Sequence, residues 1–336
     1  MAKIAFFEGE QWMVPIIEKA FPGCQLQLFE ECLSDKHLPK IKDTDILVVF
    51  IYSKVSKEVI KAMPKLKLVA TTSTGFDHID VKACQEKKIT VCNVPFYGEN
   101  SVAEHAMALI LSISRLIPQS VERTRSGEFS YQGLRGFDLK GKTIGVIGSG
   151  HIGLNLIRYA KAFGMDVLCF DVVLNNDAAK DLGFKYVPLD ELLSKSDIIS
   201  LHAPYNPHTH HMINKANIVK LKKGAILINN ARGGLIETEA LLSALESGIV
   251  SAAGLDVMEA ENALLDPSKF AQCPESKPED LRLLAQDFVL LKHPRVFVTP
   301  HTAFNTWEAI RRILDTTLDN ISSFNKGEPK NLVKLV

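Results

Sequence analysis

Side chains that could carry out chemistry follow three predicted strands. Arg232 comes directly after an apolar strand, and its guanidinium could bind a carboxylate through two parallel hydrogen bonds. Asp256 ends the next strand, Glu261 lies shortly beyond it, and His301 follows the last strand. A histidine beside a carboxylate is a common proton donor and acceptor. Because ligands bind at the carboxyl ends of the strands in open α/β sheets, these side chains are candidates for one site.

Each of these residues also has a plainer interpretation. Arg232 could form a surface salt bridge. One or both of Glu259 and Glu261 could be solvated loop charges, a role that suits Glu259 better. An arginine, a glutamate and a histidine around a nicotinamide would nevertheless make a complete site for reducing a keto acid.

A glycine-rich turn predicts where a dinucleotide would bind. The apolar, β-branched run Thr143–Ile147 is followed by Gly148, Gly150 and Gly153 in a G-x-G-x-x-G pattern. Glycines at these positions allow a tight turn, close approach of backbone amides to a pyrophosphate, and close packing of the next helix. Asp171 closes the following strand, where a carboxylate could bind both ribose hydroxyls and repel a 2′-phosphate. This order favours an NAD site over a glycine turn in an empty α/β domain.

Composition narrows the classes of function. A length of 336 residues suggests about two domains. The 39 basic and 39 acidic residues give a formal net charge of +0, so nothing indicates nucleic acid or an anionic membrane as a partner. The apolar runs are too short for a transmembrane helix, and the N-terminus becomes acidic too early for a signal peptide. The six cysteines form no CxxC pair, which favours a reducing cytoplasm.

A histidine cluster raises the question of a metal site. His208, His210 and His211 lie close together in the sequence. No carboxylate or cysteine triplet accompanies them, so we expect no metal there.

The first hundred residues alternate short apolar strands with helical patterns. We expect strands over residues 3–7, 25–29, 45–51, 67–71 and 89–93. Helical patterns lie between most of them, for example over 55–62 and 81–87. This alternation predicts a parallel sheet that is covered by helices on both faces.

A second α/β unit begins at Thr143. We expect its strands over residues 143–147, 167–170, 198–202, 225–229, 252–257 and 296–299. Helices follow the glycine turn and fit residues 189–193, 238–247 and, loosely, 280–292. Six strands with intervening helices are enough for a doubly wound sheet. Residues 262–280 contain three prolines and little periodicity, which indicates an irregular surface insertion.

A buried helix is expected between these two units. Ser101 and Glu104 fit a capping box at its start, and Pro118 should end it. His105 on this helix is expected to be a packing histidine rather than a catalyst. Residues 123–140 then indicate a polar surface connection, and a long amphipathic helix is expected near the C-terminus over 306–324.

Several motifs occur together in one order between residues 74 and 304. They are Thr74–Asp80, Asn93–Tyr97, Ala103–Ala106, Leu139–Gly153, His202–Pro204, Asn229–Gly233, Leu255–Glu261 and Pro300–Phe304. Taken jointly, they resemble the D-isomer-specific 2-hydroxyacid dehydrogenase family, and within it the D-lactate dehydrogenase branch. The N-terminal strands are also similar to the first domain of that family.

The resemblance implies an α/β protein of two Rossmann-like or flavodoxin-like domains, with doubly wound parallel sheets and the active site in the cleft between the domains. Residues 1–100 plus 301–336 would form the substrate-binding domain. Residues 101–300 would form the NAD-binding Rossmann domain inserted into it. Sequence pattern alone does not show that the last helix returns to the first domain. The family also implies a homodimer.

The resemblance assigns roles to single residues. Arg232 would hold the substrate, His301 would be the acid/base, and Glu261 would be its carboxylate partner. Asp171 would bind the adenosine ribose, and Asp256 would contact the nicotinamide side. The other positions that match cofactor contacts are Gly148, Gly150, His151, Ile152, Gly153, Ala203, Pro204, Thr209, Asn230 and Ala231. The positions that match substrate contacts are Thr74, Gly75 and Tyr97, with Phe304 and Tyr52 as an apolar wall.

Two residues depart from the common family pattern. Met258 stands where many relatives have an aromatic residue, which could alter packing near Glu261. Asn262 replaces a proline, as is usual in the D-lactate branch.

The expected activity is NAD-dependent reduction of pyruvate to D-lactate. Two alternatives stay open at this point. The substrate could be another D-2-hydroxy acid, derived from a branched-chain, aromatic or dicarboxylic keto acid or from glyoxylate, because the sequence does not give the shape of the pocket. The chain could also be an NAD(H)-sensing binding protein on the same scaffold.

Overall fold

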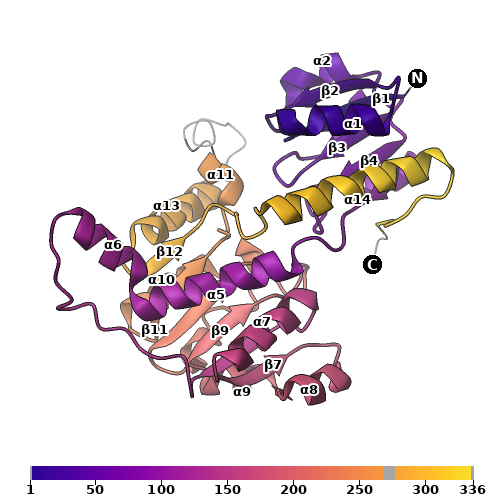
Figure 1. Ribbon diagram of the computed structural model, residues 1–336. Coiled ribbons are helices and arrows are strands. Elements are labelled where there is room, and N and C mark those ends of the chain that lie inside the picture. The colour runs from indigo at the N-terminus through magenta and orange to yellow at the C-terminus, as the bar shows by residue number, and fades with distance from the viewer. Residues whose placement is uncertain (1, 266, 268–276, 334–336) are drawn as a thin grey trace. The chain divides into compact units, whose positions relative to one another are not determined.

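The computed structural model describes residues 2–265, 267 and 277–333, and the chain divides into two compact units (Figure 1). Unit 1 comprises Met1–Tyr97 and Thr306–Val336, and unit 2 comprises Gly98–Asn305. Unit 1 contains a five-stranded parallel sheet and unit 2 a seven-stranded parallel sheet, which confirms the expected α/β class. None of the described helices combines the length and the apolarity that crossing a membrane requires.

Unit 1 is built on strands in the order β2-β1-β3-β4-β5. The strands are β1 (Lys3–Phe7), β2 (Gln25–Phe29), β3 (Ile46–Val49), β4 (Leu68–Thr71) and β5 (Thr90–Cys92). All neighbours are parallel, and Ile46 lies opposite Ile4 on one side and Leu68 on the other. The carboxyl ends of all five strands therefore point to the same edge of the sheet.

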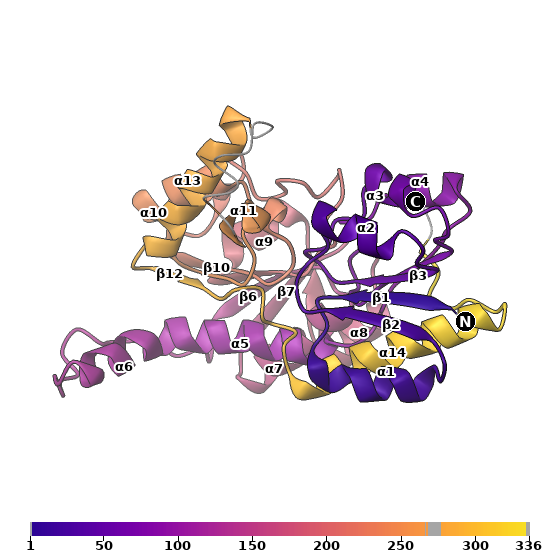
Figure 2. The same cartoon turned by 90° about the horizontal axis from the view of Figure 1, so that it is seen from above.

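Helices cover both faces of this sheet (Figure 2). They are α1 (Val14–Ala20), α2 (Leu38–Ile41), α3 (Lys57–Ala62), α4 (Val81–Glu86) and α14 (Trp307–Asn325). On the face of α1 and α14, Ile46 packs in one core with Ile17 and Leu314. On the face of α2 and α3, Leu47 packs in another core with Ile60. Burial on both faces explains why the central strands β3 and β4 are almost continuous apolar runs, whereas the edge strand β2 alternates glutamine and leucine.

Unit 2 has the strand order β12-β11-β10-β9-β6-β7-β8, all parallel. The strands are β6 (Thr143–Ile147), β7 (Asp166–Phe170), β8 (Lys185–Tyr186), β9 (Ile198–Leu201), β10 (Ala225–Asn229), β11 (Val250–Leu255) and β12 (Val296–Val298). The chain moves outward from β6 to β8, returns to β9 beside β6, and then moves outward in the other direction. The switch point between β6 and β9 is the usual ligand-binding position of a doubly wound sheet.

Most helices of unit 2 lie on the two faces of the second sheet, and α6 continues outward from the end of α5 (Figure 1). The helices of this unit are α5 (Glu99–Arg115), α6 (Ile117–Arg125), α7 (His151–Ala162), α8 (Asn176–Leu182), α9 (Leu189–Lys195), α10 (Thr238–Glu246), α11 (Glu261–Leu265) and α13 (Pro278–Lys292). On one face, Val146 of β6 shares a core with Ile110 of α5 and Leu156 of α7. On the other, Ile147 shares a core with Leu241 of α10.

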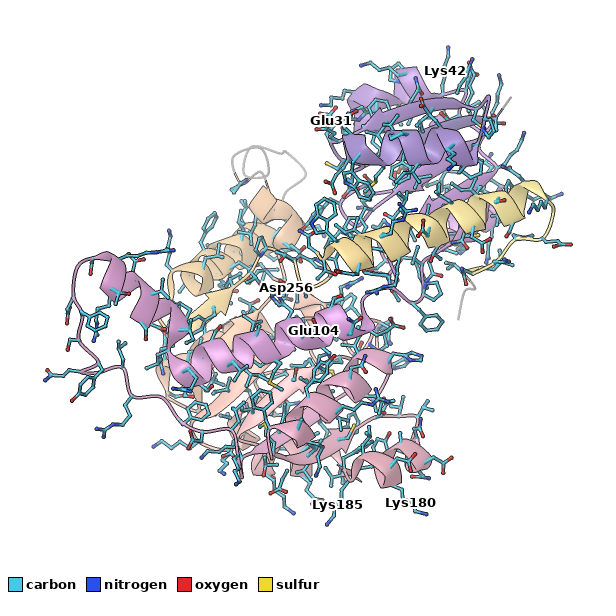
Figure 3. All side chains as sticks on the ribbon, in the orientation of Figure 1. Glu31, Lys42, Glu104, Lys180, Lys185 and Asp256 are labelled. Atoms are coloured by element: carbon cyan, nitrogen blue, oxygen red, sulfur yellow. The ribbon has the colours of Figure 1, made fainter. Side chains whose placement is uncertain are left out.

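The start of α5 differs from the prediction. The helix begins at Glu99 with Gly98 as its N-cap, so Ser101 and Glu104 lie inside it and form no capping box. Ser101 is buried, whereas Glu104 is exposed on α5 (Figure 3). Pro118 does not simply end a helix either. It lies in the first turn of α6, where a missing N–H costs nothing. The expected connection over 123–140 therefore starts with the last residues of α6.

Several short elements were not predicted, among them α6, α8 and β8. The expectation of an irregular insertion over 262–280 is wrong at both of its ends. At its start, residues 262–265 belong to α11. At its end, residues 278–280 belong to α13, with Pro278 in the first helical turn. Residues 266 and 268–276, which include Cys273 and Pro274, lie outside the described residues.

Candidate active site

The turn between β6 and α7 has room for a phosphate group and cannot accept larger residues at two of its glycines. Gly148 has φ +100°, and a Cβ there would lie 2.7 Å from the carbonyl carbon of His202. A Cβ on Gly153 would lie 2.0 Å from the oxygen of Gly148. A Cβ on Gly150 would meet no atom within 4 Å, so the space beside this backbone is open. An open space at the N-terminus of α7 fits the pyrophosphate of a dinucleotide.

The Asp171 carboxylate is fixed beside this turn by hydrogen bonds. Its Oδ2 accepts from the backbone N of Ser149 at 2.6 Å and from the Ser149 hydroxyl at 2.9 Å, and its Oδ1 accepts from Val173 N at 3.0 Å. Burial alone would raise the pKa of Asp171, but the hydrogen bonds from Val173 and Ser149 lower it below its ordinary value. The side chain is therefore a charged acceptor at neutral pH. Tyr186 of β8 supports it by donating to the Ser149 hydroxyl at 2.8 Å.

His301 and Glu261 form a close pair. His301 Nδ1 lies 2.6 Å from Glu261 Oε1, and their side chains are 15% and 22% exposed. Because Nδ1 faces the carboxylate, Nε2 is the ring nitrogen left to exchange a proton with a ligand. Phe304 lies edge-on to the imidazole with ring centroids 6.3 Å apart. The structure thus brings together two of the three residues, Arg232, Glu261 and His301, that the sequence indicates for reducing a keto acid.

Asp256 fixes the loop that carries His301. Its side chain is buried and accepts hydrogen bonds from the Thr299 hydroxyl at 2.5 Å, from Thr302 N at 2.9 Å and from Ala303 N at 2.8 Å. Its backbone oxygen accepts from His301 N at 2.8 Å. His105 joins the network, with Nε2 3.0 Å from the Thr299 hydroxyl. The described contacts of Asp256 therefore hold the His301 loop in place.

Arg232 lies in a loop that is folded on Asn229. The Asn229 side chain donates to the oxygen of Arg232 at 2.9 Å and accepts from Ala231 N at 3.1 Å. Arg232 Nη1 donates to the oxygen of Ala231 at 2.9 Å. The next residue, Gly233, packs so closely that a Cβ there would lie 2.1 Å from the oxygen of Met258. This contact joins the loop of Arg232 to the loop that leads to Glu261.

Comparison with known proteins supports this picture. Residues 107–303 match the model of the D-isomer specific 2-hydroxyacid dehydrogenase, NAD binding domain.

The chain belongs to the D-isomer specific 2-hydroxyacid dehydrogenase family. It is 36% identical over 341 residues to a D-lactate dehydrogenase of Escherichia coli, which covers 98% of this chain and 100% of that one. It is 35% identical over 301 residues to a glyoxylate reductase of Korarchaeum cryptofilum, covering 88% and 84%. Its fold is similar to the crystal structure of D-lactate dehydrogenase from Aquifex aeolicus complexed with NAD and lactic acid. That match has a TM-score of 0.87, 37% identity and coverage of 97% and 96%.

The protein is therefore an NAD-dependent D-2-hydroxyacid dehydrogenase. Its NAD-binding domain contains the glycine turn and Asp171, and this agrees with the space found beside Gly150. The buried side chain of Asn230 adds a further sign of a ligand. Neither of its polar atoms has a hydrogen-bond partner among the described residues, so both could be satisfied by a bound group.

The other positions that resemble cofactor contacts of the dehydrogenase family lie at the same edge of the sheet in unit 2. His151 and Ile152 begin α7, and Ala203, Pro204 and Thr209 follow β9. The Thr209 hydroxyl donates to the oxygen of Pro204 at 2.7 Å, which closes this segment into a compact loop.

In unit 1 of the dehydrogenase, the predicted substrate contacts follow the carboxyl ends of the strands. The Thr74 hydroxyl donates to the oxygen of Val94 at 2.9 Å, and Gly75 is next to it. Tyr97 follows β5, and its backbone oxygen accepts a hydrogen bond from Arg312 Nε of α14 at 2.7 Å. These contacts give the segments after β4 and β5 a defined backbone course.

The sequence analysis missed Glu8, which holds the loop of Tyr52. Its carboxylate accepts from Phe50 N and Tyr52 N, both at 3.2 Å, and from the Ser53 hydroxyl at 2.5 Å. Burial raises the pKa of Glu8, and these hydrogen bonds offset the rise only in part. The available signal was its position directly after β1, at the same edge of the sheet as the other candidates.

Glu259 also differs from its expected role as a solvated charge. Its side chain is only 12% exposed and pairs with His211 Nε2. It also accepts from Thr238 N at 3.1 Å and from the Thr238 hydroxyl at 2.8 Å. Of the three clustered histidines, His211 thus faces a carboxylate. His210 stacks on the His211 ring, with ring centroids 3.7 Å apart. The prediction failed because these partners lie far from Glu259 in the sequence.

Proposed function

We propose that this dehydrogenase reduces pyruvate to D-lactate with NADH. The observation that carries the proposal is the His301–Glu261 pair at 2.6 Å, at the end of a sheet that also holds the NAD turn. A histidine held by a carboxylate is suited to protonate the oxygen of a keto acid as it is reduced. The substrate is proposed from the relatives, since one is named D-lactate dehydrogenase and another was solved with lactic acid.

Arg232, His301 and Glu261 would divide the work on the substrate. The Arg232 guanidinium would bind the carboxylate of the keto acid and polarise its carbonyl. His301 Nε2 would donate a proton to the carbonyl oxygen, and Glu261 would keep the imidazole oriented and favour its protonated form. NADH supplies the hydride when it is bound.

The two units would have different tasks. Unit 2 would bind NAD through the positions at its glycine turn and through Asp171, Asn230 and Asp256. Unit 1 would bind the substrate, with the Thr74–Gly75 backbone and Tyr97 near its carboxylate. Tyr52 and Phe304 would face its methyl group. A small apolar wall of this kind suits pyruvate better than a larger or charged keto acid.

Glyoxylate is the second candidate substrate, because a relative with 35% identity is named glyoxylate reductase. Glyoxylate lacks the methyl group of pyruvate, and one methyl group in an apolar pocket changes kcat/KM by about tenfold to two-hundredfold. The two substrates are therefore separable by kinetics.

A panel of keto acids with NADH tests the proposal. It should contain pyruvate, glyoxylate, a branched-chain, an aromatic and a dicarboxylic keto acid. We expect the highest kcat/KM with pyruvate, and a chiral assay should find D-lactate alone as the product. The His301→Gln protein, assayed beside it, controls for background reduction. Accumulation of L-lactate would show that the substrate binds in another orientation. Binding of NADH without turnover of any keto acid would indicate a sensor.

We also propose that the enzyme is a homodimer. Large apolar side chains are exposed on α6 and the segment after it, where Phe129 is 97% exposed and Tyr131 88%. Ile117 and Val121 of α6 are exposed as well. An apolar surface of this kind is typical of an interface between subunits. Light scattering after size exclusion should give twice the mass of one chain, and replacing Phe129 and Tyr131 by serine should reduce it. A single-chain mass at micromolar concentration would refute the dimer.

A further inference from the structure

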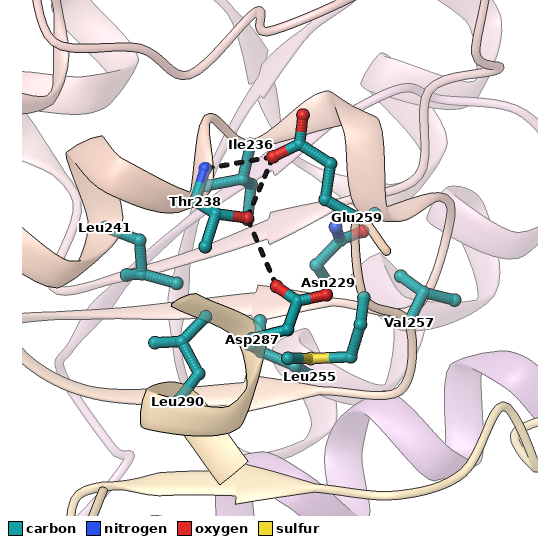
Figure 4. A pocket seen from close by; sticks show the side chains of 11 residues that line it. Asn229, Ile236, Thr238, Leu241, Leu255, Val257, Glu259, Asp287 and Leu290 are labelled. Atoms are coloured by element: carbon teal, nitrogen blue, oxygen red, sulfur yellow. Dashed lines mark hydrogen bonds between the residues drawn. The ribbon is translucent and has the colours of Figure 1, made fainter. Parts of the chain in front are cut away.

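The carboxylates of Asp287 and Glu259 lie close together beside the loop that leads to Glu261. Asp287 comes from α13 and is fully buried. Glu259 comes from the loop after β11, and Thr238 begins α10. Figure 4 shows these three side chains converging, with the Thr238 hydroxyl between the two acids.

The two acids accept hydrogen bonds from different donors. The Thr238 hydroxyl has one proton and lies 2.8 Å from Glu259 Oε2 but 3.4 Å from Asp287 Oδ1. It therefore donates to Glu259, which Thr238 N and His211 also contact. Asp287 has a different main donor, because its Oδ2 accepts from the backbone N of Ala260 at 2.8 Å.

Ala260 directly precedes Glu261, which places this contact next to the candidate active site. Glu259 fixes the chain through its side chain, and Asp287 fixes the following peptide group through Ala260 N. The chain is thus held on two sides immediately before the residue that contacts His301. A hydrogen bond of 2.6 Å such as that between Glu261 and His301 weakens when either group moves by a fraction of an ångström.

We propose that Asp287 is a positioning residue of the reaction. By accepting the Ala260 N–H, it would place the Glu261 carboxylate against His301 Nδ1. The inference rests on the proposed roles of Glu261 and His301. Asp287 itself would touch neither the substrate nor the cofactor.

Burying an acid at this position lowers the stability of the fold. What the acid contributes is an acceptor for the Ala260 N–H. Burial raises the pKa of Asp287 to about 6, the charges of Glu259 and Glu261 act in the same direction, and the hydrogen bond from Ala260 N opposes the rise. An apolar side chain such as leucine in α13 would avoid this cost. It could not accept the Ala260 N–H.

Substitutions of Asp287 separate positioning from packing. Asp287→Leu removes the acceptor and keeps a side chain that branches at the same carbon. Asp287→Asn keeps the acceptor, because the amide oxygen can accept from Ala260 N while the amide nitrogen donates to Thr238. Glu261→Gln shows the effect of losing the carboxylate itself. Glu279→Gln, an exposed acid in the first turn of the same helix, is the matched control.

The readout is the pH profile of kcat/KM with pyruvate, together with kcat and the Kd of NADH. In Asp287→Leu we expect kcat to fall about tenfold to a hundredfold. We expect the alkaline limb of the profile to move lower by up to about one pH unit, in the direction of Glu261→Gln, because the Glu261 carboxylate is no longer held against the imidazole. The Kd of NADH should not change. Asp287→Asn and Glu279→Gln should retain the original profile.

An unshifted profile and an unchanged kcat in Asp287→Leu would overturn the proposal, and so would an Asp287→Asn profile that matches Glu261→Gln. Should Asp287→Leu fail to fold, Asp287→Ala removes the same acceptor and is judged by the same criteria. NMR of histidine-labelled protein, with the His301 signal identified by its loss in His301→Gln, reports the contact without substrate. If pyruvate is not reduced at all, the proposed function fails. A His301 titration that moves in Asp287→Leu but not in Asp287→Asn would still support positioning.

Discussion

Replacing Asp287 by asparagine should stabilise the fold at neutral and alkaline pH. Burial raises the pKa of Asp287 from an ordinary 3.8 to about 6. Folding therefore favours the protonated acid, and the associated stability is complete below about pH 4 and is lost as the pH rises through 6. The difference of about two pKa units corresponds to about 3 kcal/mol at pH 8. At pH 5 the acid is still mostly protonated in the folded state, and the cost is about 1.5 kcal/mol.

An asparagine has no charge to bury, so Asp287→Asn should gain stability over the natural protein, and the gain should grow by about 1.5 kcal/mol between pH 5 and pH 8. Urea unfolding followed by circular dichroism at a series of pH values measures this growth. Trp12 and Trp307 both lie in unit 1, whereas Asp287 lies in unit 2. Tryptophan fluorescence therefore follows the unfolding of unit 1 and gives an internal reference for the change in unit 2. The exposed Glu279→Gln is the control and should show no such trend. A gain that is the same at pH 5 and pH 8 would mean that the charge on Asp287 is not the cause.

Three further predictions concern the reaction. NADH should have a much higher kcat/KM than NADPH, because the charged Asp171 would meet the 2′-phosphate, and Asp171→Ser should narrow the gap. Equal kcat/KM values in the natural protein would contradict this. His301→Gln should lose about 10²–10⁴-fold in kcat while the Kd of NADH, measured by fluorescence titration, stays the same. Glu261→Gln should move the alkaline limb of the kcat/KM profile to lower pH, because the imidazolium loses its anion. An unchanged pH optimum would show that Glu261 is not the partner.

Most strands of both sheets were predictable because they are short apolar runs between polar turns. The bounds of β1, β2, β6 and β10 agree with the sequence analysis, and the other long strands differ by a few residues at their ends. A strand that is buried on both faces can be recognised from its own apolar residues, whichever strand it pairs with. In contrast, β8 has two residues, which pair with Leu168 and Cys169 of β7, and this leaves too little pattern to detect.

Helix boundaries were less predictable where two local signals compete. Ser101 and Glu104 have the spacing of a capping box, yet the helix extends back to Gly98. In the folded chain Ser101 is buried, so tertiary packing of this face decides where the helix starts. Pro118 is compatible both with the end of one helix and with the first turn of the next. Only the αL backbone of Leu116, which separates α5 from α6, decides between them.

The candidate catalytic residues and the residues that hold them differ in how far their partners lie along the chain. Arg232, Glu261 and His301 could be found because each follows a strand, and the parallel sheet brings strand ends to one edge. Asp287 has no such local signal, since it lies in the middle of a helix, and its partner Ala260 is 27 residues away. Residues that do chemistry are tied to strand ends by the fold, whereas residues that position them can come from any element that packs nearby. A sequence can therefore indicate the reaction of this dehydrogenase before it indicates what keeps the reacting groups in place.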